Sequence, residues 1–161
     1  MIEEHSVFSI PFDKFADYYL KIAETVATRS SCLKKKYGAV IVRENEIIST
    51  GFNGPPRGEP HCTVCTKKSG NKDMDEYCSC PAVHAEQNSI ISAARKDMIG
   101  STLYLACLDK DGNSVPAYPC EICLRLIKNA GINAVVNSRG NIYYRVNNIL
   151  EKIDENFTEE N

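Results

Sequence analysis

The chain has 161 residues, of which 43% are hydrophobic, a size and composition that predict a single domain over 1–161 with a substantial core. Its 19 basic and 21 acidic side chains give a net charge of −2, whereas polynucleotide-binding proteins usually carry a basic surplus, so we expect a small substrate and no polynucleotide. No segment approaches the roughly 18 consecutive apolar residues of a membrane-spanning helix, and we expect no membrane insertion.

The first half of the chain predicts one helix, a hairpin and a long irregular segment. Apolar residues at helical spacing indicate an amphipathic helix over 12–29, with Asp13 able to cap its start. Two strands rich in β-branched residues follow at 37–43 and 46–52. Residues 53–83 show no periodicity, and a loop of that length argues against a compact domain unless a metal or another constraint holds it.

The second half is predicted to alternate helices with strands: a helix over 82–97, a strand over 102–108, a helix over 120–130, strands over 132–137 and 142–146, and a terminal helix over 147–155. Pro119 and Gly131 suit the start and the C-terminal cap of the second helix. The last six residues are expected to be frayed. This order predicts an α/β fold whose mixed sheet is covered by helices, with the apolar run 102–108 at its centre.

The chain has eight cysteines, and the redox state of its compartment decides whether such residues form disulfides or remain free to bind metal. The N-terminal residues 1–5 lack the basic region and apolar run of a secretory signal, so we expect a cytoplasmic protein. Thiols remain reduced in the cytoplasm, where clustered cysteines are more often metal ligands than disulfides.

Two short motifs carry the metal-binding chemistry: His84-Ala85-Glu86 and Pro119-Cys120-Glu121-Ile122-Cys123. Cys120 and Cys123 are three residues apart at a predicted helix start, so their sulfurs face one side. With His84 they make three ligands for a catalytic Zn2+, which leaves its fourth position open to water. Glu86 lies two residues from the ligand histidine, close enough to reach that position. The pair of motifs matches the H-x-E and P-C-x-x-C signature of zinc-dependent nucleobase deaminases.

This residue set predicts a hydrolytic deamination. Zinc lowers the pKa of a bound water towards ~7. Glu86 would accept a proton from that water, pass it to the ring nitrogen, and protonate the amine that leaves as ammonia. A purely structural zinc site, in which Glu86 is only a solvated carboxylate at a helix start, is the alternative. The most distant alternative is a non-catalytic zinc-binding module.

The sequence resembles the cytidine and deoxycytidylate deaminase superfamily, and most of all the deoxycytidylate (dCMP) deaminases, including the bacterial competence-operon type. The likeness runs from Arg29 to about Ile132 and is carried by Arg29-Ser30-Ser31-Cys32, Gly38-Ala39-Val40-Ile41-Val42, Ile48 to Pro56, His61-Cys62, His84-Ala85-Glu86-Gln87-Asn88, Pro119 to Cys123, and Ala130-Gly131-Ile132. It implies a three-layer α/β/α cytidine-deaminase-like fold with a five-stranded mixed sheet. It also implies conversion of dCMP to dUMP and ammonia, with Glu86 as the proton shuttle. A related base, nucleoside or pathway intermediate is the alternative substrate.

The resemblance also suggests substrate contacts. Asn53 is similar to the residue that hydrogen-bonds the substrate sugar, although an Asn before a Gly also suits a turn. Arg29 and Ser30 occupy an arginine-serine position that suggests contact with phosphate. The alternative for this pair is a solvated helix end, where Arg complements the helix dipole.

Regulation and assembly are further expectations from the resemblance. Several family members form hexamers and bind dCTP and dTTP around a Gly-Tyr-Asn-Gly loop, so we expect a homo-oligomer and consider these nucleotides as effectors. Here the loop reads Gly51-Phe52-Asn53-Gly54 and lacks the tyrosine hydroxyl. Residues 109–118 form an insertion at the expected mouth of the site, which bears on the exact substrate.

Four further cysteines predict a second, structural zinc. Cys32, Cys62, Cys65 and Cys80 provide enough thiolates for a closed tetrahedral site within the irregular segment. Cys78 and His61 are competing ligands that spacing alone does not rank, and reduced, unliganded thiols are the alternative. The eighth cysteine, Cys107, lies in the apolar run 102–108 and is expected to be a small core residue.

Overall fold

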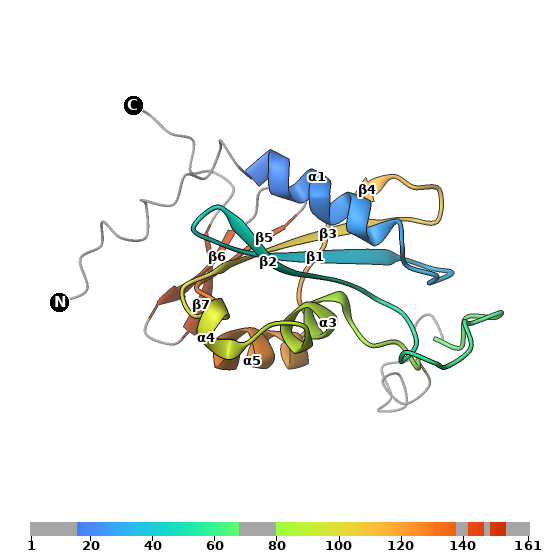
Figure 1. Cartoon of the computed structure of the whole chain (residues 1–161). Coiled ribbons are helices and arrows are strands. Elements are labelled where there is room, and N and C mark those ends of the chain that lie inside the picture. The colour runs from blue at the N-terminus through green and yellow to red at the C-terminus, as the bar shows by residue number, and fades with distance from the viewer. Residues whose placement is uncertain (1–15, 68–79, 138–141, 147–148, 154–161) are drawn as a thin grey trace.

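The computed structural model of this chain describes residues 16–67, 80–137, 142–146 and 149–153. A mixed β-sheet forms the middle layer, with helices on both faces (Figure 1). One helix covers one face, namely α1 (Ala16–Ala27). Three helices cover the other, namely α3 (Ala85–Ile91), α4 (Arg95–Met98) and α5 (Glu121–Ala130). The predicted three-layer α/β/α architecture is therefore confirmed.

The sheet has seven strands in the described part of the chain: β1 (Lys36–Arg43), β2 (Glu46–Phe52), β3 (Thr102–Leu108), β4 (Ser114–Val115), β5 (Ala134–Asn137), β6 (Ile142–Val146) and β7 (Ile149–Ile153). Their order is β2-β1-β3-β5-β6-β7, with β4 paired to the end of β3. The β3–β5 pair is parallel and the other pairs are antiparallel, so the sheet is mixed. The five predicted strands are β1, β2, β3, β5 and β6; β4 and β7 extend the sheet beyond them.

Two helix predictions need correction. The terminal helix predicted over 147–155 is wrong, because Ile149–Ile153 forms β7 and pairs with β6. A short apolar run does not distinguish helix from strand, and an available sheet edge decides its conformation. The helix predicted over 82–97 is divided into α3 and α4. The Ser92 hydroxyl bonds back to the carbonyl of Asn88, and Ala94 takes an extended backbone, which separates the two helices.

Other sequence predictions agree with the structure or lie outside the described residues. The start of the first helix at 12–15, with Asp13, and the last residues of the chain lie outside them. Within 53–67 and 80–83 there is no helix or strand, and the paired backbone of Gly54 and Val83 is an isolated bridge. Gly131 caps α5 in a left-handed conformation, as predicted. The described residues include no helix that is both long and apolar enough to cross a membrane.

The sheet carries a hydrophobic core on each face, and β3 contributes to both. Leu103, Leu105 and Cys107 pack in the core that lies under α3 and α5. Tyr104 and Ala106 alternate with them and pack under α1. The position of 102–108 at the centre of the sheet is thus confirmed, and Cys107 is fully buried, as expected for a core residue.

A glycine sets the distance between α3 and the sheet. A Cβ atom at Gly51 in β2 would overlap the backbone of Ala85 and Ser89 in α3, so the helix rests directly on the strand. Two side-chain bonds reinforce this contact: the Ser49 hydroxyl donates to the Ser89 carbonyl at 2.7 Å, and the Asn88 amide donates to the Phe52 carbonyl at 2.7 Å. This close packing fixes the first turn of α3 relative to β2.

The substitution Gly51→Ala tests this contact. Because the added methyl group meets backbone atoms that cannot rotate away, we expect a loss of about 1–3 kcal/mol in the free energy of unfolding. Denaturant unfolding followed by circular dichroism measures it. Gly54→Ala is the matched control, since a Cβ there meets only the Ser31 hydroxyl at 3.9 Å. Equal stability of the two variants would contradict the proposed role of Gly51.

Candidate active site

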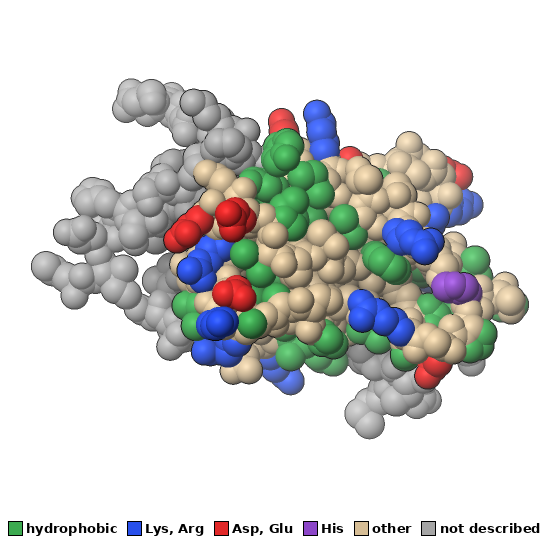
Figure 2. All heavy atoms as spheres, viewed as in Figure 1, with side chains coloured by type: hydrophobic (Ala, Val, Ile, Leu, Met, Phe, Trp, Pro, Cys, Tyr) green, Lys and Arg blue, Asp and Glu red, His purple; other side chains and the backbone are tan. Residues whose placement is uncertain are grey.

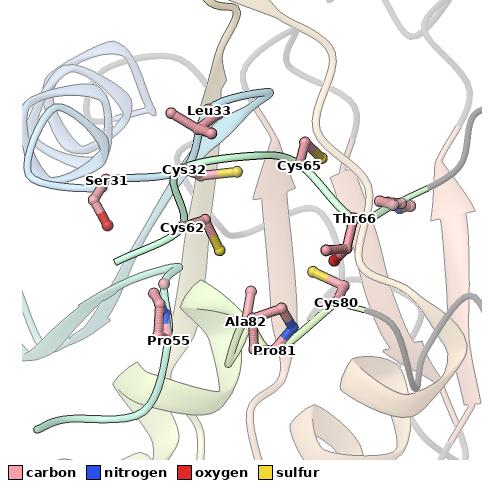
Figure 3. Close-up of a pocket in the computed structure, with 12 residues that line it drawn as sticks. Ser31, Cys32, Leu33, Pro55, Cys62, Cys65, Thr66, Cys80, Pro81 and Ala82 are labelled. Carbon is pink, nitrogen blue, oxygen red and sulfur yellow. The ribbon is translucent and has the colours of Figure 1, made fainter. Parts of the chain in front are cut away.

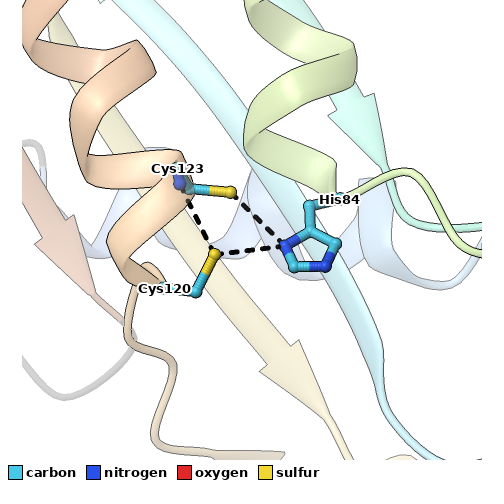
Figure 4. Close-up of side chains that lie close together, drawn as sticks. All are labelled: His84, Cys120 and Cys123. Atoms are coloured by element: carbon cyan, nitrogen blue, oxygen red, sulfur yellow. Dashed lines mark hydrogen bonds between the residues drawn. The ribbon is translucent and has the colours of Figure 1, made fainter. Parts of the chain in front are cut away.

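The three predicted zinc ligands come together at the starts of two helices. His84 is the N-cap of α3, Cys120 is the N-cap of α5, and Cys123 lies in the first turn of α5. Figure 4 shows the three side chains pointing toward one another from the two helices. The His84 Nδ1 atom lies 3.6 Å from the Cys120 Sγ atom and 3.3 Å from the Cys123 Sγ atom.

These separations match the ligand shell of a zinc ion. Zinc bonds of about 2.3 Å to sulfur and 2.0–2.1 Å to nitrogen, at tetrahedral angles, separate the ligand atoms by about 3.5–3.8 Å. All three ligand atoms lie within 4.8 Å of one another, and this is the one such group of three among the described residues. The donor set therefore fits zinc, with three protein ligands and one position left open.

Local hydrogen bonds hold the ligand residues in place. The backbone NH of Cys123 donates to the Cys120 sulfur at 3.4 Å, which caps α5. The NH of His84 donates to the side-chain carbonyl of Gln87 at 2.8 Å. Next to it, Val83 exchanges two backbone bonds with Gly54, at 2.8 and 3.1 Å, so the residue before His84 is tied to the chain that leaves β2.

Glu86 is buried beside this group. Its side chain is 4% exposed, and its carboxylate accepts a hydrogen bond from the Cys123 thiol. Burial raises the pKa of Glu86 to about 7, although a bond from its own backbone NH and the bond from Cys123 oppose the shift. A carboxyl group with a pKa near neutrality can both accept and release a proton, which is what a proton shuttle needs.

Burial and neighbouring charges also shift the pKa values of two predicted ligands, His84 and Cys123. Burial, and then the charge of Lys67, lower the pKa of His84, so the neutral imidazole that binds metals is favoured. Burial, and then the neighbouring Glu86, raise the pKa of Cys123. A bound cation would favour the Cys123 thiolate instead, because a metal ion is the largest local charge in such a site.

A cavity of about 330 Å³ opens over Glu86, His84 and Cys120, a size in the range of small-molecule sites. Asn53 lines it, yet both polar atoms of the Asn53 side chain already bond the backbone. The Oδ1 atom accepts from the Tyr37 NH at 2.8 Å, and the Nδ2 atom donates to the Lys35 carbonyl at 3.0 Å. Asn53 therefore organises the segment that leads into β1, in addition to bordering the cavity.

Arg29 and Ser30, the predicted phosphate contacts, lie just after the end of α1, and their proposed role stays a prediction. Arg29 is exposed just after α1, and Ser30 is buried. The Ser30 hydroxyl donates to the Asn53 carbonyl at 2.8 Å and accepts from the Cys32 NH at 3.1 Å. Neither residue is among the described residues that line the cavity.

Sequence reasoning did not assign several residues that line the cavity. They are Lys34, Lys35, Tyr37, Lys67 and Tyr118. Burial, and then the neighbouring Cys107, raise the pKa of Tyr37, so its hydroxyl stays protonated. Tyr118 ends the predicted insertion, which shows that this end of the 109–118 segment reaches the cavity. Residues 109–113 form a turn closed by the Asp109 carboxylate, and β4 follows it.

The four remaining predicted ligands surround a second, smaller cavity. Cys32, Cys62, Cys65 and Cys80 line a space of about 30 Å³, which is room for about one water or ion (Figure 3). None of the described cysteines is in a disulfide. His61 is exposed, with its Nδ1 atom 2.7 Å from the Ser31 hydroxyl, and is not among the described residues lining this space. Cys78 lies outside the described residues.

Comparison with known proteins identifies the family. Residues 13–138 match the model of the cytidine and deoxycytidylate deaminase zinc-binding region. The chain belongs to the cytidine and deoxycytidylate deaminase family. This agrees with the zinc-compatible geometry of His84, Cys120 and Cys123.

Members of this deaminase family with curated names include a deoxycytidylate deaminase of Mycobacterium phage D29. It is 37% identical over 126 residues, which cover 74% of this chain and 91% of the phage protein. The deoxycytidylate deaminase of Saccharomyces cerevisiae is 34% identical over 143 residues. That alignment covers 86% of this chain but 41% of the yeast protein, so the chain spans less than half of that relative. ComE operon protein 2 of Bacillus subtilis is 31% identical over 120 residues, covering 73% of this chain and 56% of that protein.

The deaminase fold is also seen in a solved relative. The crystal structure of dCMP deaminase from the cyanophage S-TIM5, in complex with dCMP and dUMP, superposes with a TM-score of 0.57 and 27% sequence identity. The match covers 78% of this chain and 81% of the cyanophage chain.

Proposed function

We propose that this protein catalyses the hydrolytic deamination of dCMP to dUMP and ammonia. The observation that carries the proposal is the buried Glu86 hydrogen-bonded beside three zinc-compatible ligands, at the floor of a cavity that suits a small molecule. Family membership supports the reaction class, and the names of the phage and yeast relatives support dCMP as the substrate.

The residues of this chain account for the proton transfers of such a reaction. His84, Cys120 and Cys123 would hold a zinc ion, which would supply an activated water to the substrate. Glu86 takes a proton from the attacking water and delivers it to N3 of the cytosine ring. The water oxygen becomes bonded to C4, and Glu86 then takes the remaining proton of that oxygen and passes it to the 4-amino group. The C4–N bond then breaks, ammonia leaves, and the ring remains as uracil.

A substrate screen tests the proposal. The zinc-loaded protein is offered dCMP, CMP, dCTP, deoxycytidine, cytosine and guanine, with ammonia release as the readout. We expect the highest kcat/KM for dCMP. If the protein prefers another base or nucleoside, the proposed substrate is wrong and the proposed deamination chemistry still holds. A zinc-loaded sample that releases ammonia from none of them would support a non-catalytic zinc-binding module.

The variant Glu86→Gln belongs in the same screen. Because the amide cannot carry protons, we expect a loss of about 10²–10⁴-fold in kcat with the zinc content unchanged. Glu121→Gln is the matched control, since Glu121 is an exposed carboxylate in the first turn of α5. Retention of most activity by Glu86→Gln would refute the role assigned to this residue.

We also propose a second, structural zinc bound by Cys32, Cys62, Cys65 and Cys80. The four thiols line one small cavity, and three of them come from 53–67 and 80–83, described stretches without helix or strand. Thiolates are preferred zinc ligands. Bound zinc would stabilise these stretches, because a metal that binds only the folded chain adds its binding energy to stability. Free thiols at both sites also suit a reducing compartment such as the cytoplasm.

Metal analysis of variants separates the two proposed zinc sites. We expect about two zinc ions per chain in the native protein, about one in either His84→Ala or Cys62→Ser, and none in the double variant. His61→Ala is the control and should keep both ions, because the His61 ring faces Ser31. One zinc per chain in the native protein would exclude the second site, and loss of zinc in His61→Ala would make His61 a ligand.

We further propose that the protein is a homo-oligomer. The helical layer formed by α3 and α5 exposes large apolar side chains, namely Ile91, Ile122 and Leu126. Burial of such side chains against a second copy would remove apolar surface from water. Sedimentation velocity of the native protein is expected to give a mass above that of one chain, and Ile91→Asp is expected to lower it. A monomer at all concentrations would contradict the proposal. Regulation by dCTP or dTTP stays a prediction. Phe52 occupies the loop position at which the effector-binding family members have a tyrosine.

A further inference from the structure

Three lysines border the cavity that contains Glu86 and His84. Lys34 and Lys35 precede β1, and Lys67 lies in the segment that follows β2. All three side chains are exposed at the cavity edge. Glu86 is the one acidic side chain among the described residues that line this space. The rim of the cavity is thus basic, although the chain as a whole has a net charge of −2.

Two of these lysines belong to segments that border the reacting end of the cavity. The carbonyl of Lys35 accepts a hydrogen bond from the Asn53 side chain at 3.0 Å, and Asn53 itself lines the cavity. Lys67 lines the same cavity as His84 and Glu86. Lys67 also borders the adjoining space formed by His84, Gln87 and Cys120. Figure 2 shows Lys and Arg side chains distributed over one face of the molecule, among hydrophobic and acidic side chains.

The position expected for phosphate contact lies elsewhere. Arg29 is exposed after α1, and the Ser30 hydroxyl is occupied by the Asn53 carbonyl and the Cys32 NH. Neither is among the described residues that line the cavity. Among the described residues, the Lys and Arg side chains that line this cavity are the three lysines.

We propose that Lys34, Lys35 and Lys67 form the phosphate-binding end of the cavity and make the enzyme select a nucleoside 5′-monophosphate over the nucleoside. Ammonium groups bind phosphate oxygens through charge-assisted hydrogen bonds. The base of such a substrate occupies the buried floor at Glu86, and its phosphate occupies the exposed rim. Because the lysines are exposed, salt screens the attraction. The inference rests on the proposed deaminase function and names the residues that bind the phosphate of the substrate.

The test compares dCMP with deoxycytidine in lysine variants. Lys34→Gln, Lys35→Gln and Lys67→Gln are each expected to lower kcat/KM for dCMP on the order of 10-fold, and the triple variant on the order of 100-fold or more. The values for deoxycytidine should stay within about twofold of the native protein. Lys36→Gln is the matched control, because Lys36 belongs to the same run but is not among the described residues lining the cavity. Raising the salt concentration should increase KM for dCMP in the native protein and less in the triple variant.

Calorimetric binding of dUMP to the zinc-loaded protein gives a readout that needs no turnover. The triple variant is expected to bind dUMP on the order of 100-fold more weakly than the native protein, and Lys36→Gln equally well. Unchanged dCMP kinetics and dUMP affinity in the triple variant would overturn the proposal. Equal losses for dCMP and deoxycytidine would also overturn it, since they would indicate a general structural effect.

Two further outcomes distinguish this inference from the proposed function. If Arg29→Gln abolishes the preference for dCMP while the lysine variants keep it, phosphate is read after α1 and the lysine proposal fails with the deaminase function intact. If the native zinc-loaded protein deaminates no cytosine nucleotide and binds no dUMP, the proposed function fails, and the lysine assignment, which depends on it, fails with it.

Discussion

The meeting of two helix starts is the constraint on which the rest of the site depends. His84 and Cys120 are 36 residues apart in sequence, yet their ligand atoms lie 3.6 Å apart because α3 and α5 cover the same face of the sheet. The absence of a side chain at Gly51 lets α3 rest on β2, and two side-chain bonds hold it there. A metal bound between the helices would join them, so that metal binding and folding stability are coupled.

The cavity combines two electrostatic environments. At its floor, burial raises the pKa of Glu86 to about 7, so one carboxyl group can carry protons in both directions. At its rim, exposed lysines present positive charge to solvent. An anionic nucleotide fits this arrangement, with the reacting base in the buried region and the charged group at the edge. Burial at the floor of the cavity strengthens electrostatic interactions with the reacting atoms. Salt screens the interactions made at the exposed rim.

The cavity of the four thiols adjoins the candidate active site. Cys80 and Lys67 line both spaces, and Cys80 precedes His84 by only four residues. The segment between them is tied to the chain after β2 by the Val83–Gly54 bridge. A structural ion at Cys80 would therefore order the residues that position His84. The proposed ion would thus constrain 80–83, a described stretch without helix or strand that leads into His84.

The sequence by itself determined most of the elements and the reactive groups, while the tertiary structure decided the remaining elements and which groups lie together. The central strand 102–108 and the caps of α5 were predictable because burial and capping leave local signals. The grouping of His84, Cys120 and Cys123 was also predictable, because the His-x-Glu and Cys-x-x-Cys spacings are local sequence patterns. The conformation of 149–153 was not, because a short apolar run takes the form that its partner strand allows. The places of Lys67 and Arg29 relative to the cavity were equally hidden, because they depend on how distant segments pack.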